Sequence, residues 1–263
     1  MTDVEPELTN LSELIADAQR VVGFTGAGVS TESGIPDFRS PDGVWSRYDP
    51  QNFEFSNYVS RADVRQLAWE MRREFFSAGA QPNPAHRAFS QLEKSGKSPG
   101  VITQNIDGLH QLAGSQNVLE IHGTAREVMC IGSYPVNGTP EGCGWRAPYT
   151  WGFDRVDAGE TDPSCPDCGG LVKSATISFG QMLEAEVIEA SADLARSADL
   201  MIVAGSSLQV YPAAAIPIEA LDAGAELVII NDEPTPFDHM AALVIRGKAG
   251  EILRAAVPNE GPS

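Results

Sequence analysis

The sequence predicts an α/β fold in which a parallel β-sheet is covered by helices and a smaller domain is inserted into it. Five short apolar segments have the length of buried strands, at residues 21–24, 101–103, 118–121, 199–205 and 226–230. Segments with a helical pattern alternate with several of them, which is typical of a parallel sheet covered on both faces. Ligands of such sheets bind at the carboxyl ends of the strands. We therefore expect function in the residues that directly follow the strands.

Three helices of this sheet domain are indicated by their starts and apolar positions. Asn10 begins a segment in which Leu11, Leu14 and Ile15 fall on one face. Residues 213–223 form the helix between the fourth and fifth strands, and residues 250–257 form a closing helix. The strands and helices together predict a Rossmann-like domain.

Two stretches interrupt this alternation. Residues near 40–80 contain a helix whose apolar positions follow helical spacing, namely Val64, Leu67, Ala68, Met71 and Phe75. Residues near 126–174 are rich in glycine, proline and cysteine, and are too irregular for an apolar core of their own. We predict a Rossmann-like domain of residues 10–39, 80–125 and 175–257, with residues 40–79 as the helical part of a small domain and 126–174 as its second part.

Composition excludes some classes of function. The chain has 263 residues, with 36 Asp and Glu against 18 Lys and Arg, so its net charge is −18. A phosphate backbone would be repelled, which argues against nucleic acid as a partner. The charge favours basic partners such as lysine-rich segments, or else it only maintains solubility. The N-terminus lacks the pattern of a secretory signal, and no apolar run approaches the ~20 residues of a membrane span. We expect a cytoplasmic protein that binds no membrane.

All four cysteines lie in the second interrupting stretch. Cys165-Pro-Asp-Cys168 is a metal-binding knuckle, with two thiolates at the spacing that zinc sites use. Cys130 and Cys143 are separated by twelve residues, and a loop of that length can still bring both to one ion. We predict one Zn²⁺ held by all four and therefore a zinc-binding module at 126–174. Because four thiolates fill a tetrahedral shell, this zinc is structural.

A glycine-rich turn follows the first strand. Gly26 and Gly28 allow the backbone to approach a pyrophosphate and leave amide groups free to bind it. Thr31 stands where the third glycine of a dinucleotide-binding pattern would be, so a purely structural turn explains this segment equally well. The loop that continues from it holds Asp37, Phe38 and Arg39, which suit a lid over a bound nucleotide or a solvated loop.

Several ordered motifs resemble the sirtuin family, across about residues 10–257. GAGVSTESGIPDFRS, from residue 26, is similar to the family's NAD-binding signature. Gln104-Asn-Ile-Asp107 and His122-Gly123 each follow a predicted strand, as the family's motifs do. Gly205-Ser-Ser-Leu-Gln-Val210 resembles the G-T-S-L-x-V element, with Ser206 in place of Thr, and Asn231 ends the last predicted strand. The spacing of Cys130 and Cys143 departs from the family's usual pair of C-x-x-C knuckles.

The resemblance implies NAD as co-substrate and assigns residues around it. Those that hold the phosphates and cover the nicotinamide pocket are Gly26, Ala27, Gly28, Asp37, Phe38 and Arg39. Those that line this pocket are Ile35, Asn105 and Asp107, with Gln104 facing the nicotinamide ribose. Those around the adenosine are Gly205, Ser206, Ser207, Asn231 and the segment near Ala249. The substrate would pair as an added strand with Phe179, Gly180 and the region near Val210.

The implied reaction removes an acyl group from lysine. The acyl oxygen attacks the ribose as nicotinamide leaves, and a base then takes a ribose hydroxyl proton. Histidine suits that step near neutral pH, and the resemblance assigns it to His122. His86, His110 and His239 are interpreted as structural. We therefore expect an NAD-dependent protein-lysine deacylase, most simply a deacetylase, with acyl-lysine proteins as substrates. The alternatives are mono-ADP-ribosyl transfer and a non-catalytic NAD or ADP-ribose sensor, against which Asn105, Asp107 and His122 argue together.

Acyl preference depends on the helix predicted in the small domain. Sirtuins that favour acidic acyl groups carry a Tyr-x-x-Arg pair there, and an ungapped alignment puts Trp69 and Arg72 at those positions. One helical turn separates the two residues, so both could line one face. Indole lacks the acceptor of a phenol, and we expect Arg72 at the surface, with acetyl preferred over succinyl.

Overall fold

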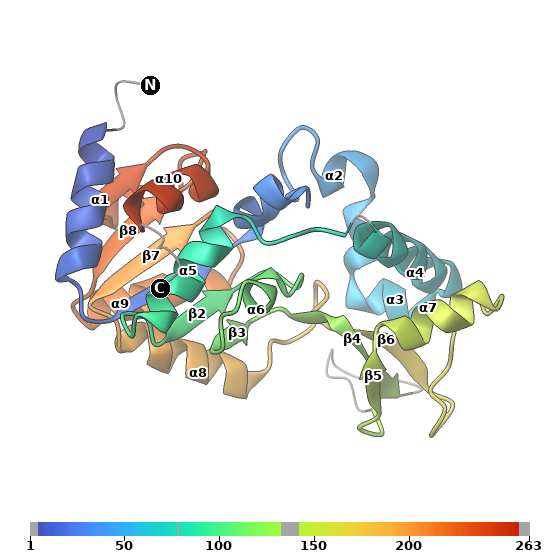
Figure 1. Ribbon diagram of the computed structural model, residues 1–263. Coiled ribbons are helices and arrows are strands. Elements are labelled where there is room, and N and C mark those ends of the chain that lie inside the picture. The colour runs from blue at the N-terminus through green and yellow to red at the C-terminus, as the bar shows by residue number, and fades with distance from the viewer. Residues whose placement is uncertain (1–4, 78, 133–141, 258–263) are drawn as a thin grey trace.

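The computed structural model describes residues 5–77, 79–132 and 142–257 and consists of a larger sheet domain and a smaller part beside it (Figure 1). The large sheet has six parallel strands in the order β3-β2-β1-β7-β8-β9. Their bounds are Val118–Glu120, Gly100–Thr103, Val21–Thr25, Leu200–Ala204, Glu226–Ile230 and Leu243–Ile245. This arrangement confirms the predicted fold class.

The register of the sheet brings the strand ends together. Thr25 at the end of β1 pairs with Thr103 of β2 on one side and with Ala204 of β7 on the other, and Ala204 pairs with Ile230 of β8. Because all four strands end level, the segments that follow them emerge at one edge of the sheet.

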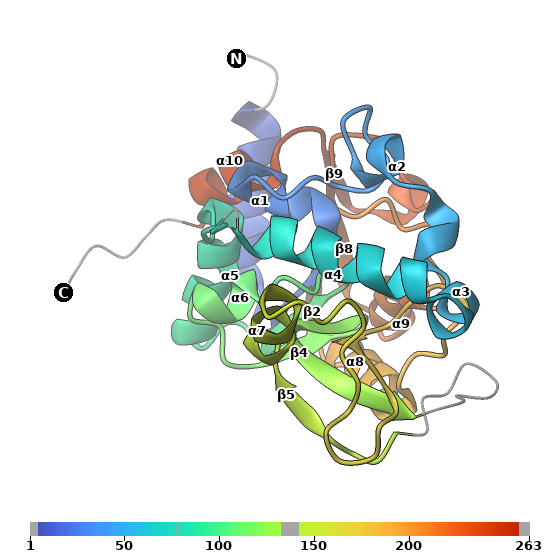
Figure 2. The same cartoon turned by 90° about the vertical axis from the view of Figure 1, so that its right-hand side faces the viewer.

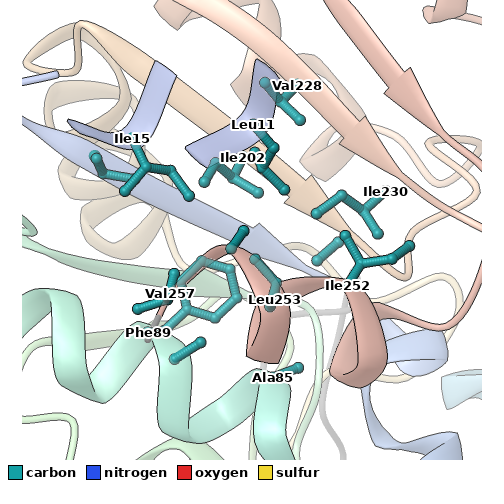
Figure 3. Packing of buried hydrophobic residues seen from close by; sticks show 14 of the residues in the cluster. Leu11, Ile15, Ala85, Phe89, Ile202, Val228, Ile230, Ile252, Leu253 and Val257 are labelled. Atoms are coloured by element: carbon teal, nitrogen blue, oxygen red, sulfur yellow. The ribbon is translucent and has the colours of Figure 1, made fainter. Parts of the chain in front are cut away.

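One face of the sheet is covered by α1 (Glu5–Asp17), α5 (Pro84–Lys94) and α10 (Ala249–Ala256). Leu11, Phe89 and Leu253 from these helices pack with buried sheet residues such as Ile202 and meet in one cluster (Figure 3). The start of α5 is fixed by local capping: Asn83 is the N-cap, Pro84 lies in the first turn, and the side chain of His86 is hydrogen-bonded back to the Asn83 amide.

The opposite face is covered by α8 (Ala185–Arg196) and α9 (Ile216–Asp222). Ala195 and Ile216 pack there against Phe24, Met201 and Ile229. Within β1, Val21 belongs to the first cluster and Val22 and Phe24 to the second, which is the alternation that a two-sided parallel sheet requires.

The smaller part combines the two interrupting stretches. It contains α2 (Val44–Arg47), α3 (Phe55–Ser60), α4 (Ala62–Ser77) and α7 (Thr150–Asp157), with a three-stranded antiparallel sheet in the order β5-β4-β6. Those strands span Arg146–Pro148, Gly123–Gly132 and Leu171–Thr176. Figure 2 faces this part, and α4 lies across it.

An apolar cluster holds this small sheet to α4. Trp69 of α4 packs with Val128 and Val172 of the small sheet and with Cys130 and Cys165. Residues 126–174 were expected to have no apolar core of their own, and the core they do have is shared with α4, because Trp145 and Trp151 of this stretch pack around a cluster that contains Trp69. The exact domain boundaries stay a prediction.

Single elements differ from their prediction. The first helix begins at Glu5 rather than Asn10, and residues 213–215 form a 3-10 turn before α9. The edge strand β9 was not predicted, since three residues give too short an apolar signal. Among the described residues, no helix is long and apolar enough to cross a membrane.

Candidate active site

A cavity of about 1640 Å³ opens at the carboxyl ends of the large sheet. Its lining includes the loops after β1, β2, β3, β7 and β8, β6 and the segment that follows it, and α2, α3 and α4 of the smaller part. The predicted NAD, substrate and catalytic residues all line it except Ala249, which is buried at the start of α10 while its neighbour Lys248 lines the cavity.

The glycine-rich turn continues from β1 into a 3-10 helix, Ala27–Ser33. The amide of Gly28 donates to the Gly205 carbonyl at 2.8 Å, so the loops after β1 and β7 touch backbone to backbone. A Cβ on Gly28 would lie 2.8 Å from the Cα of Gly205, and a Cβ on Gly26 would lie 2.8 Å from its carbonyl oxygen. Both glycines are required by this close approach, whichever ligand binds there.

The loop after this turn is held in shape by Asp37. Its Oδ1 accepts from the amides of Arg39 at 2.8 Å and Ser40 at 2.7 Å. Phe38 is 38% exposed, and its ring centroid lies 5.2 Å from that of Trp45 in α2. Arg39 donates from Nη1 to Ser207 Oγ at 3.4 Å, across the cavity mouth from the β7 loop. Ile35 also lines the cavity. This loop can cover a ligand that lies over the glycines.

Asn105 and Asp107 converge on the hydroxyl of Ser30. Asn105 donates from Nδ2 to Ser30 Oγ at 3.0 Å, and Ser30 donates to Asp107 Oδ2 at 2.7 Å. His86, whose Nδ1 accepts from the amide of Asn83, lies with Nε2 3.4 Å from the same hydroxyl. Burial raises the pKa of Asp107, and the bonds from the Leu109 amide and Ser30 oppose that rise. Ser30 was not predicted as a site residue, although it lies inside the signature segment.

His122 faces the cavity with a defined tautomer. Its Nδ1 lies 3.0 Å from the carbonyl oxygen of Gln104, which can only accept, so Nδ1 carries the proton and Nε2 is left as a basic nitrogen. Gln104 in turn donates from Nε2 to Ser206 Oγ at 2.7 Å. Burial lowers the pKa of His122, and its bond to Gln104 partly offsets the effect. The ring is therefore neutral at neutral pH.

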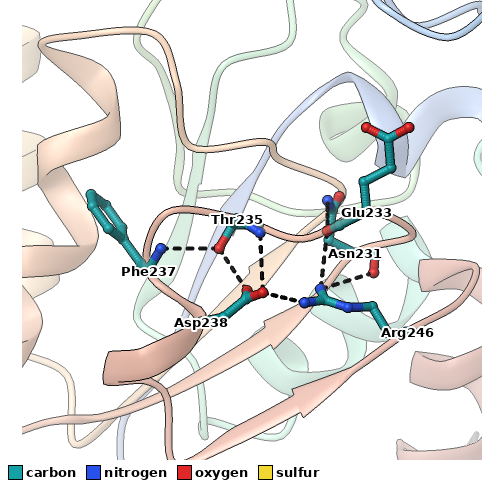
Figure 4. Close-up of polar contacts among 6 residues, drawn as sticks. All are labelled: Asn231, Glu233, Thr235, Phe237, Asp238 and Arg246. Carbon is teal, nitrogen blue, oxygen red and sulfur yellow. Dashed lines mark hydrogen bonds and ion pairs between the residues drawn. The ribbon is translucent and has the colours of Figure 1, made fainter.

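The loop after β8 is braced by Arg246 (Figure 4). Arg246 donates from Nη1 to the carbonyl of Glu233 at 3.0 Å and forms an ion pair with Asp238. Asn231 donates from Nδ2 to the same Glu233 carbonyl at 2.8 Å, and Lys248 pairs with Asp232. Arg246 and Asp238 support this loop without lining the cavity. The end of the cavity farthest along the sheet from β2 is lined by Asn231, Asp232, Glu233 and Lys248, together with Gly205, Ser206 and Ser207 of the β7 loop.

The backbone at Phe179, with which the substrate strand was predicted to pair, already makes hydrogen bonds within the chain. The amide of Phe179 donates to the Phe53 carbonyl at 3.1 Å, and its carbonyl accepts from the Phe55 amide at 2.9 Å. Both main-chain groups of Phe179 are therefore satisfied within the chain. Gly180 and Val210 line the cavity beside it, and Phe179 is 47% exposed.

The four cysteines come together in the smaller part. Their sulfur atoms all lie within 4.8 Å of one another, with Cys130 and Cys168 at 3.5 Å and Cys143 and Cys165 at 3.6 Å. Four thiolates around one zinc ion would lie about 3.8 Å apart, since each Zn–S bond is about 2.3 Å. The residues fit a tetrahedral zinc, and the twelve-residue separation does not prevent Cys143 from joining it.

The expected positions of Arg72 and Trp69 are wrong. Trp69 is 3% exposed and packs into the zinc module, whereas Arg72 lines the cavity and donates from Nη2 to Thr176 Oγ1 at 3.3 Å. Residues three apart on a helix share only part of a face, and here Trp69 packs with Val172 of β6 whereas Arg72 reaches Thr176 at the end of the same strand. Lys173 of β6 also lines the cavity, fully buried, and bonds to the carbonyls of Ser174 and Thr176.

Among the described residues, no carboxylate lies within ion-pair distance of Arg72 or Lys173. Burial lowers the pKa of Arg72 to about 10, which leaves it charged at neutral pH. The pKa of Lys173 is lowered well below its ordinary value by burial, with the nearby Arg72 adding to the effect. No sequence signal distinguished Lys173 from a surface lysine.

The sequence of this chain is similar to a known protein family and to several of its members. Residues 26–212 match the family model described as the Sir2 family. A protein of Rhodopseudomonas palustris named NAD-dependent protein deacetylase is 46% identical over 253 residues, covering 95% of both chains. NAD-dependent protein deacetylase 2 of Streptomyces coelicolor is 44% identical over 90% of this chain and 96% of its own length.

Solved structures are similar over nearly the whole chain. One, described as addressing the mechanism and regulation of Sir2 enzymes, has a TM-score of 0.84 at 39% identity and covers 96% of this chain and 97% of its own. Another is a Sir2 structure with deacetylated p53 peptide and 3′-O-acetyl-ADP-ribose, with a TM-score of 0.85 at 34% identity, covering 98% of this chain and all of its own.

Proposed function

The chain belongs to the Sir2 family, and from that premise we propose how its own residues carry out NAD-dependent removal of acyl groups from lysine. The protein is an NAD-dependent protein-lysine deacylase that releases nicotinamide and O-acyl-ADP-ribose, with deacetylation as its reference activity. The observation that carries the assignment of roles is the position of His122, with basic Nε2 in the same cavity as Asn105 and Asp107.

Each part of NAD has a region of the cavity that suits it. The loops at Gly26–Gly28 and Gly205 contact each other through their backbones, and their main-chain groups are suited to bind the pyrophosphate. The pocket at Asn105 and Asp107 offers a carboxylate and amide groups to the nicotinamide carboxamide, which needs both a donor and an acceptor. The braced loop at Asn231 suits the adenosine. The four thiolates hold a structural zinc ion, which orders the small sheet and fills no place in the reaction.

In the reaction, His122 takes a proton, and the Gln104 carbonyl then stabilises the positive charge on its ring. The acyl oxygen bonds to C1′ of the ribose as the bond to nicotinamide breaks. Nε2 of His122 then accepts a ribose hydroxyl proton, while Nδ1 keeps its hydrogen bond to the Gln104 carbonyl. That carbonyl becomes a stronger partner once the ring is cationic, because the bond is then charge-assisted.

Deacylation should persist at a lower pH than an ordinary histidine allows. The base works only when neutral, so the rate falls as pH drops through its pKa, and burial moves this pKa below the usual ~6.5. Measured as kcat/KM against pH, the midpoint of the acidic limb is expected below ~6.5. Melting temperatures over the same range control for acid unfolding. A midpoint above that value would contradict the assignment to this buried ring.

The location of Arg72 changes the expected acyl preference. An acidic acyl group in this cavity would meet a guanidinium that has no carboxylate partner among the described side chains, instead of burying an unpaired charge. We therefore propose that acidic acyl chains such as succinyl are accepted, and are not rejected as they would be if Arg72 lay at the surface.

Arg72→Met should reduce use of succinyl-lysine relative to acetyl-lysine by about 10- to 100-fold, the equivalent of a charge-assisted bond of about 1.5–3 kcal/mol. The measurement is the ratio of kcat/KM for matched peptides. Arg73→Met is the matched control, because Arg73 is the next residue of α4 but is half-exposed and paired with Asp157. An unchanged ratio in Arg72→Met would show that Arg72 does not reach the acyl group.

We propose a cytoplasmic location, which is supported by the grouping of every cysteine in one metal site. Fractionation of cells that produce the protein would test it.

A further inference from the structure

The segment that carries Asn105 and Asp107 is short and is anchored at both ends. It leaves β2 after Thr103 and enters α6 (Leu109–Leu112). At its start, the amide of Asn105 donates to Thr103 Oγ1 at 3.0 Å. At its end, Asp107 Oδ1 accepts from the Leu109 amide at 2.9 Å and so begins the helical turn that contains His110. Whatever fixes Thr103 and His110 therefore fixes both pocket residues.

A single chain of hydrogen bonds joins these two anchors. Thr25 and Thr103 end adjacent strands and face each other in register, and Thr25 Oγ1 donates to Thr103 Oγ1 at 2.8 Å. Thr25 Oγ1 also lies 2.9 Å from Nε2 of His110. The Thr25 hydroxyl proton is already donated to Thr103, so Thr25 is the acceptor from His110, and Nε2 carries the proton of the ring.

His110 is built to remain in that state. It is 1% exposed, and its ring packs against the rings of His86 at 4.8 Å and Phe89 at 5.8 Å between centroids. Burial, together with the nearby His86, lowers the pKa of His110 well below its ordinary value, so the ring stays neutral. Its Nδ1 has no hydrogen-bond partner within the described part of the chain, which leaves Thr25 as the one polar attachment of the ring there.

We propose that His110 is a positioning residue for the nicotinamide pocket. Through Thr25 and Thr103 it closes the segment between β2 and α6 into a hydrogen-bonded loop, and it thereby sets the backbone that aims Asn105 and Asp107. This inference rests on the proposed function for the identity of the ligand. It assigns a role to a histidine that the sequence indicated only as structural.

This role is separate from the contact that Ser30 makes. Ser30 holds the side chains of Asn105 and Asp107 from the turn after β1, whereas His110 and the two threonines hold the backbone that carries them. Loosening the backbone should therefore disturb nicotinamide while leaving the phosphate and adenosine ends of the cavity intact. A loss of affinity for the whole dinucleotide would instead indicate a general structural role.

The test uses Thr25→Val, which keeps the size of the side chain and removes the hydroxyl, with His110→Leu and His110→Gln. The Gln amide can place a donor where Nε2 lies, and so serves as the conservative rescue. Two quantities are measured: the rate at which labelled nicotinamide exchanges into NAD in the presence of acetyl-lysine peptide, and the affinity for ADP-ribose, which lacks nicotinamide.

We expect exchange to fall about three- to tenfold in His110→Leu, as for loss of one buried neutral hydrogen bond, and at least as far in Thr25→Val, whose hydroxyl makes both bonds of the chain, with ADP-ribose affinity unchanged. The double variant should fall no further than Thr25→Val, because that variant already breaks the whole chain. His110→Gln should retain most of the rate. Unchanged exchange in Thr25→Val, or ADP-ribose affinity falling in step with exchange, would overturn the proposal.

Failure of the proposed function gives a different result, since the wild type would then show no exchange at all. In that case the ratio of NAD to ADP-ribose affinity, measured by calorimetry without turnover, still reports on the nicotinamide pocket. A ratio that is the same in wild type and Thr25→Val would overturn the positioning role by itself.

Discussion

Cys165→Ser is expected to lose the bound zinc and to unfold at ordinary temperature. Structural zinc contributes on the order of 10 kcal/mol of apparent binding energy that doubles as folding energy, which is as large as the whole stability of a typical domain. Cys165 is buried in the cluster that joins the small sheet to α4, so removal of the ion should also release Trp69. The zinc content, measured by atomic spectroscopy, and the melting temperature should fall together.

Cys143→Ser is the sharper variant, because Cys143 comes from the long first loop that the sequence left uncertain. Its sulfur lies 3.6 Å from that of Cys165, so its loss should resemble Cys165→Ser. Glu160→Gln, at an exposed position of the same module, serves as the control and should keep its metal. If Cys143→Ser retains full zinc and stability, the ion has another fourth ligand.

His122→Ala should lower the rate of deacylation by about 10²–10⁴-fold, the usual effect of removing a general base. Affinity for NAD should stay within a few-fold, because the base acts after nicotinamide has left and its ring makes its one described hydrogen bond within the chain, to the Gln104 carbonyl. Single-turnover product formation and calorimetric NAD binding separate these two quantities.

His239→Ala is the matched control for the same substitution. His239 is exposed in the loop after β8 and does not line the cavity, so its loss should leave turnover unchanged. Near-normal turnover by His122→Ala would remove this residue from the mechanism. An equal loss in both variants would point to nonspecific damage.

The sheet domain could be predicted from sequence because its signals are local and agree with one another. Each central strand is a short apolar run, and the motifs follow those strands, where parallel register collects them at one edge. The same logic brings Gly26, Asn105, His122 and Ser206 to one cavity. The first helix was placed too late because Glu5 and Glu7, which suit a helix N-terminus, carry no apolar periodicity.

The small domain was less predictable because its contacts are between distant segments. The sequence shows that Trp69 and Arg72 are one turn apart, but only packing against β6 and the zinc module decides that the indole is buried and the guanidinium reaches the cavity. Lys173 likewise looks like any strand lysine until the approach of α4 encloses it. The hydroxyl chain from His110 through Thr25 to Thr103 depends on strand register, which composition and periodicity do not give.

The most direct test of the account is mass spectrometry of an acetyl-lysine peptide incubated with the protein, with and without NAD. We expect the peptide to lose its acetyl group only when NAD is present. Nicotinamide and O-acetyl-ADP-ribose should each form in an amount equal to that of the deacetylated peptide. Addition of ADP-ribose to a protein with the acetyl group retained would indicate mono-ADP-ribosyl transfer, and NAD binding without any change in mass would indicate a sensor. Either of these results would contradict the deacylase assignment.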